Sequence, residues 1–203
     1  MSQDDIYHTI SGVYEAEIKI KGSKFISTIC AVTSLDEAEN FIHELSKKYY
    51  NATHNCYAFR VRTKTQVIER LSDAGEPSGT AGPPIMDVLR GRDLYNVAVV
   101  VTRYFGGTKL GKGGLVRAYR DSTKEVIEIA KIVKKINYKK LKLIFGYDLT
   151  GLVMRMIEQF KGRVVASQYN ADVEIDAELP DSSVQKFRDE LVESSSGQIS
   201  IEP

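Results

Sequence analysis

A glycine-rich connection between a buried strand and a long helix constrains this chain more than any other segment. The apolar run at 96–105 predicts a buried strand, and apolar residues at helical spacing predict a helix over 114–135. Four glycines and two lysines lie between them, within residues 106–113. Such a connection brings the helix start, with its unpaired N–H groups and partial positive charge, to one end of a sheet. We therefore expect a mixed α/β domain with an anion-binding position at this end.

The segments before this connection predict the remaining strands and helices of the same domain. Alternation over 13–20, returned over 25–32, predicts a hairpin, and 54–62 and 66–71 predict two more strands. Ser34-Leu35-Asp36-Glu37 has the form of a capping box, which predicts a helix of about four turns behind it. A short helix is expected near 85–89. The predicted fold class is α+β.

A second, smaller set of elements begins after residue 136. The patterns predict a strand, a helix, two strands, a second helix and a last strand, which is the βαββαβ order of a ferredoxin-like domain. An acidic row in the third of these strands alternates with apolar residues, so we expect it on the water-facing side rather than around a metal. We divide the chain into an N-terminal domain, 1–135, and a C-terminal domain, 136–203.

Charge also divides near residue 136. Residues 1–135 hold 20 Lys and Arg against 16 Asp and Glu, a net charge of +4, whereas residues 136–203 hold 8 against 11, a net charge of −3. Positive charge gathers between Arg90 and Lys124, where only Asp93 and Asp121 oppose eight cations. This asymmetry favours an anionic partner for the first domain. The other interpretation is a solvated helix face on which Asp121, Glu125 and Glu128 pair with the cations.

The glycine-rich connection supplies the candidate nucleic-acid or anion-binding residues. These are Arg103, Gly106, Gly107, Lys109, Lys112, Gly113, Arg117 and Arg120. The segment is close to a Walker A loop, but Gly113 stands where Ser or Thr would bind Mg²⁺, which argues against a P-loop NTPase. Arg117 and Arg120 lie in the first turns of the predicted helix, where its dipole disfavours cations, so stability alone would not place them there.

A second irregular loop, 73–84, combines three glycines with three prolines. Loops of this length are often functional. We expect Thr80 to cap the helix that follows, and Asp73 and Glu76 form a candidate carboxylate pair. His54 and Cys56 share one face of a strand, so His54, Cys56 and Asp73 are a candidate nucleophile, base and orienting set. No recognised local signature supports that set, and we predict no catalytic residue.

Cysteine spacing and hydropathy bound the cofactors and the location. Cys30 and Cys56 show neither a metal-binding nor a disulfide pattern, and we predict no metal or cofactor. The acidic N-terminus is not followed by an apolar run, and the longest apolar stretch, Val97–Val101, is far shorter than the roughly 20 residues that span a bilayer. We expect a cytoplasmic protein with no membrane partner. The sequence leaves the oligomeric state open.

Three motifs extend over much of the first domain. They are His54-x-Cys56-x-Ala58; Asp73-x-Gly75-Glu76-Pro77-x-Gly79-Thr80-Ala81-Gly82-x-Pro84; and Val99-Val100-Val101-x-Arg103-Tyr104-Phe105-Gly106-Gly107-x-x-Leu110-Gly111-x-Gly113-Gly114-Leu115-Val116-x-Ala118-Tyr119. Together they resemble the YigZ/IMPACT family, and the C-terminal region resembles the extra domain of its bacterial members. The resemblance assigns Asp73, Glu76, Gly79 and Thr80 to a family motif loop.

The resemblance implies a fold and a functional setting. It implies a first domain with the β-α-β topology shared by a ribosomal small-subunit protein and the fourth domain of the translocating elongation factor, and a second domain like that factor's fifth. Eukaryotic relatives regulate translation during amino-acid starvation by binding a ribosome-associated activator of a kinase. We do not expect their extra N-terminal interaction domain here, so that role does not transfer. No catalytic residue comes across with the family.

Three functional hypotheses remain open from the sequence. The first is a non-catalytic protein that binds RNA or the ribosome and acts in the regulation of translation, with a translation-associated protein as a further partner. The second is a small-molecule or phosphate-handling enzyme, hydrolase-like, that uses the 73–84 and 106–114 loops around one pocket. The third is a protein-interaction module that acts through the acidic C-terminal domain. The fold-level likeness alone does not decide among them.

Overall fold

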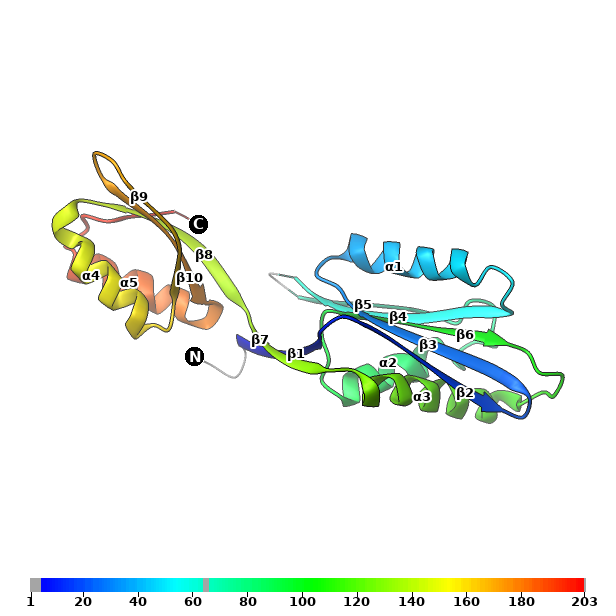
Figure 1. Ribbon diagram of the computed structural model, residues 1–203. Coiled ribbons are helices and arrows are strands. Elements are labelled where there is room, and N and C mark those ends of the chain that lie inside the picture. Colours follow the sequence, from blue (N-terminus) through cyan, green and yellow to red (C-terminus); the bar gives the residue numbers. More distant parts are fainter. Residues whose placement is uncertain (1–4, 64–65, 203) are drawn as a thin grey trace. The chain divides into compact units, whose positions relative to one another are not determined.

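The computed structural model describes residues 5–63 and 66–202 (Figure 1). The chain forms two compact units. One is His8–Lys134, and the other joins the segment ending at Tyr7 to Lys135–Pro203. Relative to the division drawn from the sequence, the beginning of the chain is grouped with the C-terminal unit.

The first unit is built on a five-stranded sheet in which every strand runs antiparallel to its neighbours. In spatial order the strands are β2 (Val13–Ile20), β3 (Ser23–Ala31), β6 (Val97–Tyr104), β4 (His54–Arg62) and β5 (Val67–Ser72). The β2–β3 hairpin closes through Lys21 and Gly22, which both have positive φ (46° and 81°), as a two-residue hairpin turn with matching twist requires.

Helices cover both faces of this sheet (Figure 1). Helix α1 (Leu35–Lys48) packs on one face, and α2 (Gly82–Gly91) and α3 (Gly111–Ile129) pack on the other. Along β6, Val97, Val99 and Val101 join the core beneath α2 and α3, whereas Ala98 faces the core beneath α1. This two-sided burial explains why β6 is a continuous apolar run rather than an alternating one.

The predicted start of α1 is confirmed, with Ser34 as its N-cap, although the reciprocal bond of a capping box is made to Thr33 rather than to Ser34. The Ser34 hydroxyl accepts a hydrogen bond from the Glu37 N–H at 3.1 Å, and the Glu37 carboxylate accepts from the Thr33 N–H at 2.7 Å. The two side chains satisfy backbone donors on either side of the helix start, which begins α1 at Leu35.

The second unit carries a four-stranded sheet in the order β11-β8-β10-β9. Its elements follow the chain as β8 (Tyr138–Phe145), α4 (Thr150–Gln159), β9 (Arg163–Tyr169), β10 (Val173–Pro180), α5 (Val184–Ser194) and β11 (Ser200–Glu202). The odd-numbered positions of β10 are buried, and the acidic row lies on the opposite face. There Glu174 pairs with Lys142 at 2.7 Å and Glu178 pairs with Arg163 at 2.6 Å, so two of the acidic residues hold cross-strand ion pairs.

The predicted end of the long helix, at residue 135, is wrong. Helix α3 ends at Ile129, and Ala130 is already extended (φ −77°, ψ 138°). Residues Ile132–Ile136 form strand β7, which pairs with β1 (Ile6–Ile10) in a separate two-stranded sheet that the sequence analysis missed. Pairing with a strand far away in the chain replaces the last turns of the predicted helix, a tertiary effect that local spacing does not report.

The mixed α/β class is confirmed. Within residues 5–63 and 66–202 the structure has five α-helices and three sheets. None of the helices in this range is long and apolar enough to cross a membrane.

Gly106 is required by a close approach between two backbone segments. A Cβ placed on Gly106 would lie 1.9 Å from the carbonyl carbon of Gly22 in the β2–β3 turn. The Gly106 N–H donates to the Ser23 hydroxyl at 3.2 Å, which fastens the second glycine loop to that turn. The first role of Gly106 is therefore packing of backbone against backbone.

We predict that Gly106→Ala lowers the free energy of unfolding by about 2 kcal/mol or more, because the new methyl group has no space beside rigid backbone. Gly113→Ala is the matched control, since nothing lies within 4 Å of a Cβ there and the residue is helical. The control should be neutral or should stabilise by up to about 1 kcal/mol. Denaturant unfolding of both variants tests this, and equal stabilities would contradict the packing role.

Candidate functional site

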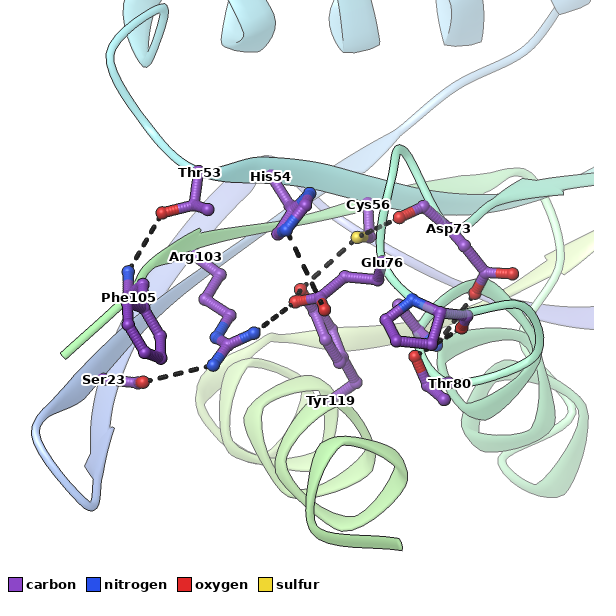
Figure 2. A network of polar contacts seen from close by, with 12 residues as sticks. Ser23, Thr53, His54, Cys56, Asp73, Glu76, Thr80, Arg103, Phe105 and Tyr119 are labelled. Atoms are coloured by element: carbon purple, nitrogen blue, oxygen red, sulfur yellow. Dashed lines mark hydrogen bonds and ion pairs between the residues drawn. The ribbon is translucent and has the colours of Figure 1, made fainter. Parts of the chain in front are cut away.

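A buried ion pair joins the end of β6 to the 73–84 loop. Arg103, the penultimate residue of β6, donates from Nη1 to Oε1 of Glu76 at 2.7 Å. Only 5% of Arg103 and 8% of Glu76 is exposed. The Tyr119 hydroxyl of α3 donates to the same oxygen at 2.8 Å. Figure 2 shows Arg103 and Tyr119 converging on Glu76, so that three separate segments of the chain meet at this carboxylate.

Aromatic rings surround the guanidinium group. The Arg103 Cζ atom lies 5.5 Å from the ring centroid of Phe25 and 5.6 Å from that of Phe105. Phe25 meets Tyr119 edge to face at 5.3 Å. Arg103 Nη2 donates to the Ser23 hydroxyl at 3.3 Å, but Nε is buried with no hydrogen-bond partner among the described residues. An apolar surround of this kind weakens solvent screening and strengthens the ion pair.

Asp73 organises the rest of the first glycine loop. Its Oδ1 accepts from the N–H groups of Ala81 and Gly82 at 2.9 Å each, and its Oδ2 accepts from Gly79 N–H at 2.8 Å. Partial burial opposes ionisation of Asp73, but these three donors outweigh it and leave its pKa below the usual value. The expected cap, Thr80, makes no capping bond, because its hydroxyl donates to the Pro77 carbonyl at 2.6 Å.

His54 is oriented from the same loop. Its Nδ1 lies 2.9 Å from the Ala74 carbonyl oxygen. Because a carbonyl oxygen only accepts, Nδ1 carries a proton in this contact, and in the neutral form of the ring Nε2 is an acceptor. That Nε2 lies 3.9 Å from Oε2 of Glu76, the oxygen that neither Arg103 nor Tyr119 uses (Figure 2).

The geometry gives no support to the candidate set of His54, Cys56 and Asp73, which we did not adopt as catalytic. Cys56 is fully buried, and its Sγ donates to the Asp73 carbonyl at 2.9 Å. Burial raises the pKa of Cys56 to about 12, which keeps the thiol protonated and unreactive at neutral pH. The Asp73 carboxylate binds three backbone N–H groups, and Glu76 is held by Arg103 and Tyr119, so the two carboxylates serve different segments. Cys56 and Asp73 therefore support the loop.

The two glycine-rich loops line one pocket of about 490 Å³. Glu76 and Pro77 contribute from the first loop, and Lys109 to Lys112 contribute from the second, with His54, Arg103 and Phe105 between them. Gly107 and Gly111 have positive φ (87° and 72°), which gives the second loop its path to the start of α3. A pocket of this size, apolar with a few convergent polar groups, has the character of a ligand site.

The predicted binding residues separate into three places. Arg103 is buried in the ion pair, Lys109 and Lys112 are exposed beside the pocket, and Arg117 and Arg120 are exposed along α3. Arg120 and Lys124 border a second hollow of about 350 Å³ between α2 and α3. Gly113 lies in open space at the start of the helix. Across residues 5–63 and 66–202, His, Cys, Asp and Glu form no group of three or more suited to a metal ion.

Two functional features escaped the sequence analysis. Tyr119 appeared there only as part of a motif, but its ring is buried and its hydroxyl donates to Glu76. Arg103 was placed there on RNA, although a cation that continues the buried run of β6 must itself be buried and paired. The position of Arg103 within that run was the available signal.

We predict that Asp73→Asn lowers the free energy of unfolding at pH 7 by about 2 kcal/mol, since a charged acceptor of three N–H groups is lost and an amide NH₂ faces at least one of them. The pKa of Asp73 is lowered by folding, so its ionised form stabilises the protein above the unfolded pKa of about 3.9. That stability is lost as the pH falls through the lower folded pKa, and the difference in stability between wild type and variant should shrink there.

Asp121→Asn, an exposed control on α3, should change stability by less than about 0.5 kcal/mol. A difference in the free energy of unfolding between wild type and Asp73→Asn that does not change with pH would contradict this role of Asp73.

This chain is similar in sequence and in structure to known proteins over most of its length. The Impact N-terminal domain matches residues 21–127, and a domain of unknown function, DUF1949, matches residues 143–198. The chain is 34% identical to the IMPACT family member YvyE of Bacillus subtilis, over 96% of this chain and 89% of that one. It is 31% identical to the IMPACT family member YigZ of Escherichia coli, over 90% of each chain. A crystal structure of a hypothetical protein superposes with a TM-score of 0.69 at 27% identity, covering 97% of this chain and 96% of that one. By sequence over nearly its whole length, this chain belongs to the IMPACT family.

Proposed function

We propose that this protein is a cytoplasmic, non-catalytic binding protein that contacts RNA, on the ribosome or close to it, and acts in the regulation of translation. The observation that carries the proposal is a group of exposed cations with no ion pair among the described residues. They are Lys109, Lys112, Arg117, Arg120 and Lys124.

The pairing of neighbouring cations makes this observation informative. Arg60 and Arg90 pair with Glu69, Arg92 pairs with Glu128, and Arg103 pairs with Glu76. The other interpretation expected Asp121, Glu125 and Glu128 to pair with the cations. Glu128 does pair, with Arg92, whereas neither Asp121 nor Glu125 forms an ion pair among the described residues. Unpaired arginines and lysines are available to phosphate groups, whose counterions they would release.

Three of these cations form a helix stripe, defined here as Arg117, Arg120 and Lys124. They follow one another at i, i+3 and i+7 on the face of α3 opposite the buried residues Leu115, Ala118, Ser122 and Val126. A row of unpaired cations on one helix face can contact the phosphates of a nucleic-acid backbone. The stripe is the part of the surface that we assign to RNA.

The folds implied by the resemblance are part of the proposal. The element order of the second unit and its sheet order, β11-β8-β10-β9, support a ferredoxin-like domain. We propose likewise that the first unit resembles the ribosomal small-subunit protein and the fourth domain of the elongation factor. Those likenesses, together with the translation role implied for eukaryotic relatives, favour a ribosomal setting over a free metabolite as the main partner.

The enzyme alternative gains one supporting observation, namely that both glycine loops line the same pocket. The most nucleophilic side chain near it, Cys56, is held protonated by burial. The groups that do face the pocket, His54, Glu76 and Arg103, are arranged to bind rather than to attack. We therefore keep the pocket as a binding feature.

Ribosome co-sedimentation of the full chain at stepped salt concentrations tests the proposal. We predict that the logarithm of the binding constant falls linearly with the logarithm of the salt concentration. The Arg117→Ala/Arg120→Ala/Lys124→Ala variant should bind more weakly, with a slope reduced by roughly 2 to 3.

The control removes the same charge elsewhere. Lys139, Lys140 and Arg155 are exposed cations of the second unit with no ion pair within the described range, and their triple alanine variant should bind like wild type. Binding that ignores salt, or equal losses in both triple variants, would contradict a specific RNA contact along α3.

A further inference from the structure

Three residues that line the pocket between the two glycine loops carry polar atoms whose hydrogen-bonding capacity the protein leaves unused. Oε2 of Glu76 and Nε2 of His54 accept no hydrogen bond within the described part of the chain, and Nε of Arg103 donates none. All three residues line the pocket. Their side chains are 3%, 19% and 6% exposed in that order, so they are held against the protein interior.

A buried donor without a partner is costly, typically by the full desolvation penalty of the group. The Arg103 Nε–H has no partner even though Nη1 and Nη2 of the same guanidinium are satisfied. An unsatisfied buried group in a native structure calls for an explanation, and the one adopted here is a ligand that supplies the missing partner. The same reasoning applies to the 3.9 Å gap between Glu76 and His54, which suits a group that donates to both.

The walls of the pocket are apolar and one of them is aromatic. Leu110, Leu115 and Pro77 line it together with Phe105, whose side chain is 47% exposed although it is a large hydrophobic residue. Phe105 is held in place, because its N–H donates to the Thr53 hydroxyl at 3.0 Å and its ring lies against the Arg103 guanidinium. A fixed, partly exposed ring is a surface on which a planar group can stack.

The rim of the pocket is positive and lies at a helix start. Lys109 and Lys112 line it and make no ion pair among the described residues. Helix α3 begins at Gly111 with no side-chain cap and no acidic residue in its first turn, so its first N–H groups remain open to an anion. The rim therefore suits a phosphate group a short distance from the polar floor.

We propose that this pocket binds a single nucleotide, with the base on the floor against Phe105 and the phosphate at Lys109 and Lys112. Two free acceptors and one free donor match a base edge that presents two donors and one acceptor. Guanine has that edge, with N1–H and the N2 amino group as donors and O6 as the acceptor, whereas the pairing edges of adenine and cytosine carry one donor group each. The inference does not depend on RNA binding by the helix stripe.

Isothermal titration calorimetry on the full chain, with GMP, AMP, CMP, UMP, guanosine and inorganic phosphate as probes, tests the proposal. GMP should bind more tightly than the other mononucleotides and than inorganic phosphate. Phe105→Ala removes an exposed ring and should weaken GMP about tenfold without changing phosphate binding. Lys109→Ala/Lys112→Ala should weaken GMP but leave guanosine unchanged.

Two further variants separate this site from its surroundings. Glu76→Gln should lower the preference for GMP over AMP, and Phe105→Ala keeps the test valid if Glu76→Gln fails to fold. Arg117→Ala/Lys124→Ala is the control, since neither residue lines the pocket, and it should bind GMP like wild type. This control also keeps the outcome distinct from that of the RNA experiment.

A competition experiment then identifies the source of the nucleotide. Displacement of a labelled single-stranded RNA by GMP would assign the pocket to one nucleotide of a bound strand, and simultaneous binding of both would assign it to a free nucleotide. Either outcome supports the site. The proposal is overturned if no nucleotide binds wild type at millimolar concentration, or if GMP and inorganic phosphate bind equally and Phe105→Ala affects neither.

Discussion

The ion pair between Arg103 and Glu76 is the interaction on which the organisation of the first unit depends. Removing two charges from water is costly, and the cost is recovered only where geometry and further hydrogen bonds are good. Here the two groups are 2.7 Å apart, Tyr119 and Ser23 supply additional hydrogen bonds, and Phe25 and Phe105 shield the guanidinium. The pair fixes the 73–84 loop against the sheet and against α3 at one point.

Other contacts extend this fixed point into a rigid frame for the pocket. Asp73 ties the beginning of the first loop to its end, where α2 starts. The contact between Gly22 and Gly106 ties the second loop to the β2–β3 turn. Each loop is thus attached at two positions that are distant in sequence. Between these attachments the pocket lies open, with Lys109 and Lys112 beside it and the helix stripe continuing along α3. The candidate binding residues therefore lie on two loops that the sheet and helices of the first unit hold in place.

The elements whose burial repeats with a short period could be predicted from the sequence. The continuous apolar run of β6 indicated a buried strand, Ser34 and Glu37 indicated the start of α1, and the acidic row of β10 indicated a polar face. The mixed α/β class followed from these patterns, and membership of the IMPACT family followed from the loop motifs.

Long-range contacts could not be predicted in the same way. Strand β7 contains Lys134 and Lys135, and only its partner β1 makes a strand of it. Asp73 resembled a catalytic carboxylate because its three backbone donors come from residues six to nine positions later. Arg103 resembled a surface cation because its partner lies 27 residues earlier, in an irregular loop. The shared pocket depends on the contacts of Asp73 and Arg103, which spacing alone does not reveal.

A double-mutant cycle between Glu76 and Arg103, followed by denaturant unfolding, tests the central claim most directly. Glu76→Gln and Arg103→Met should each cost about 3 kcal/mol or more, because each leaves an unpaired charge in the interior. The double variant should lose far less than the sum of the two, with a coupling energy of about 2 kcal/mol or more. Additive losses, within about 0.5 kcal/mol, would contradict the claim that this pair fixes the 73–84 loop to the sheet.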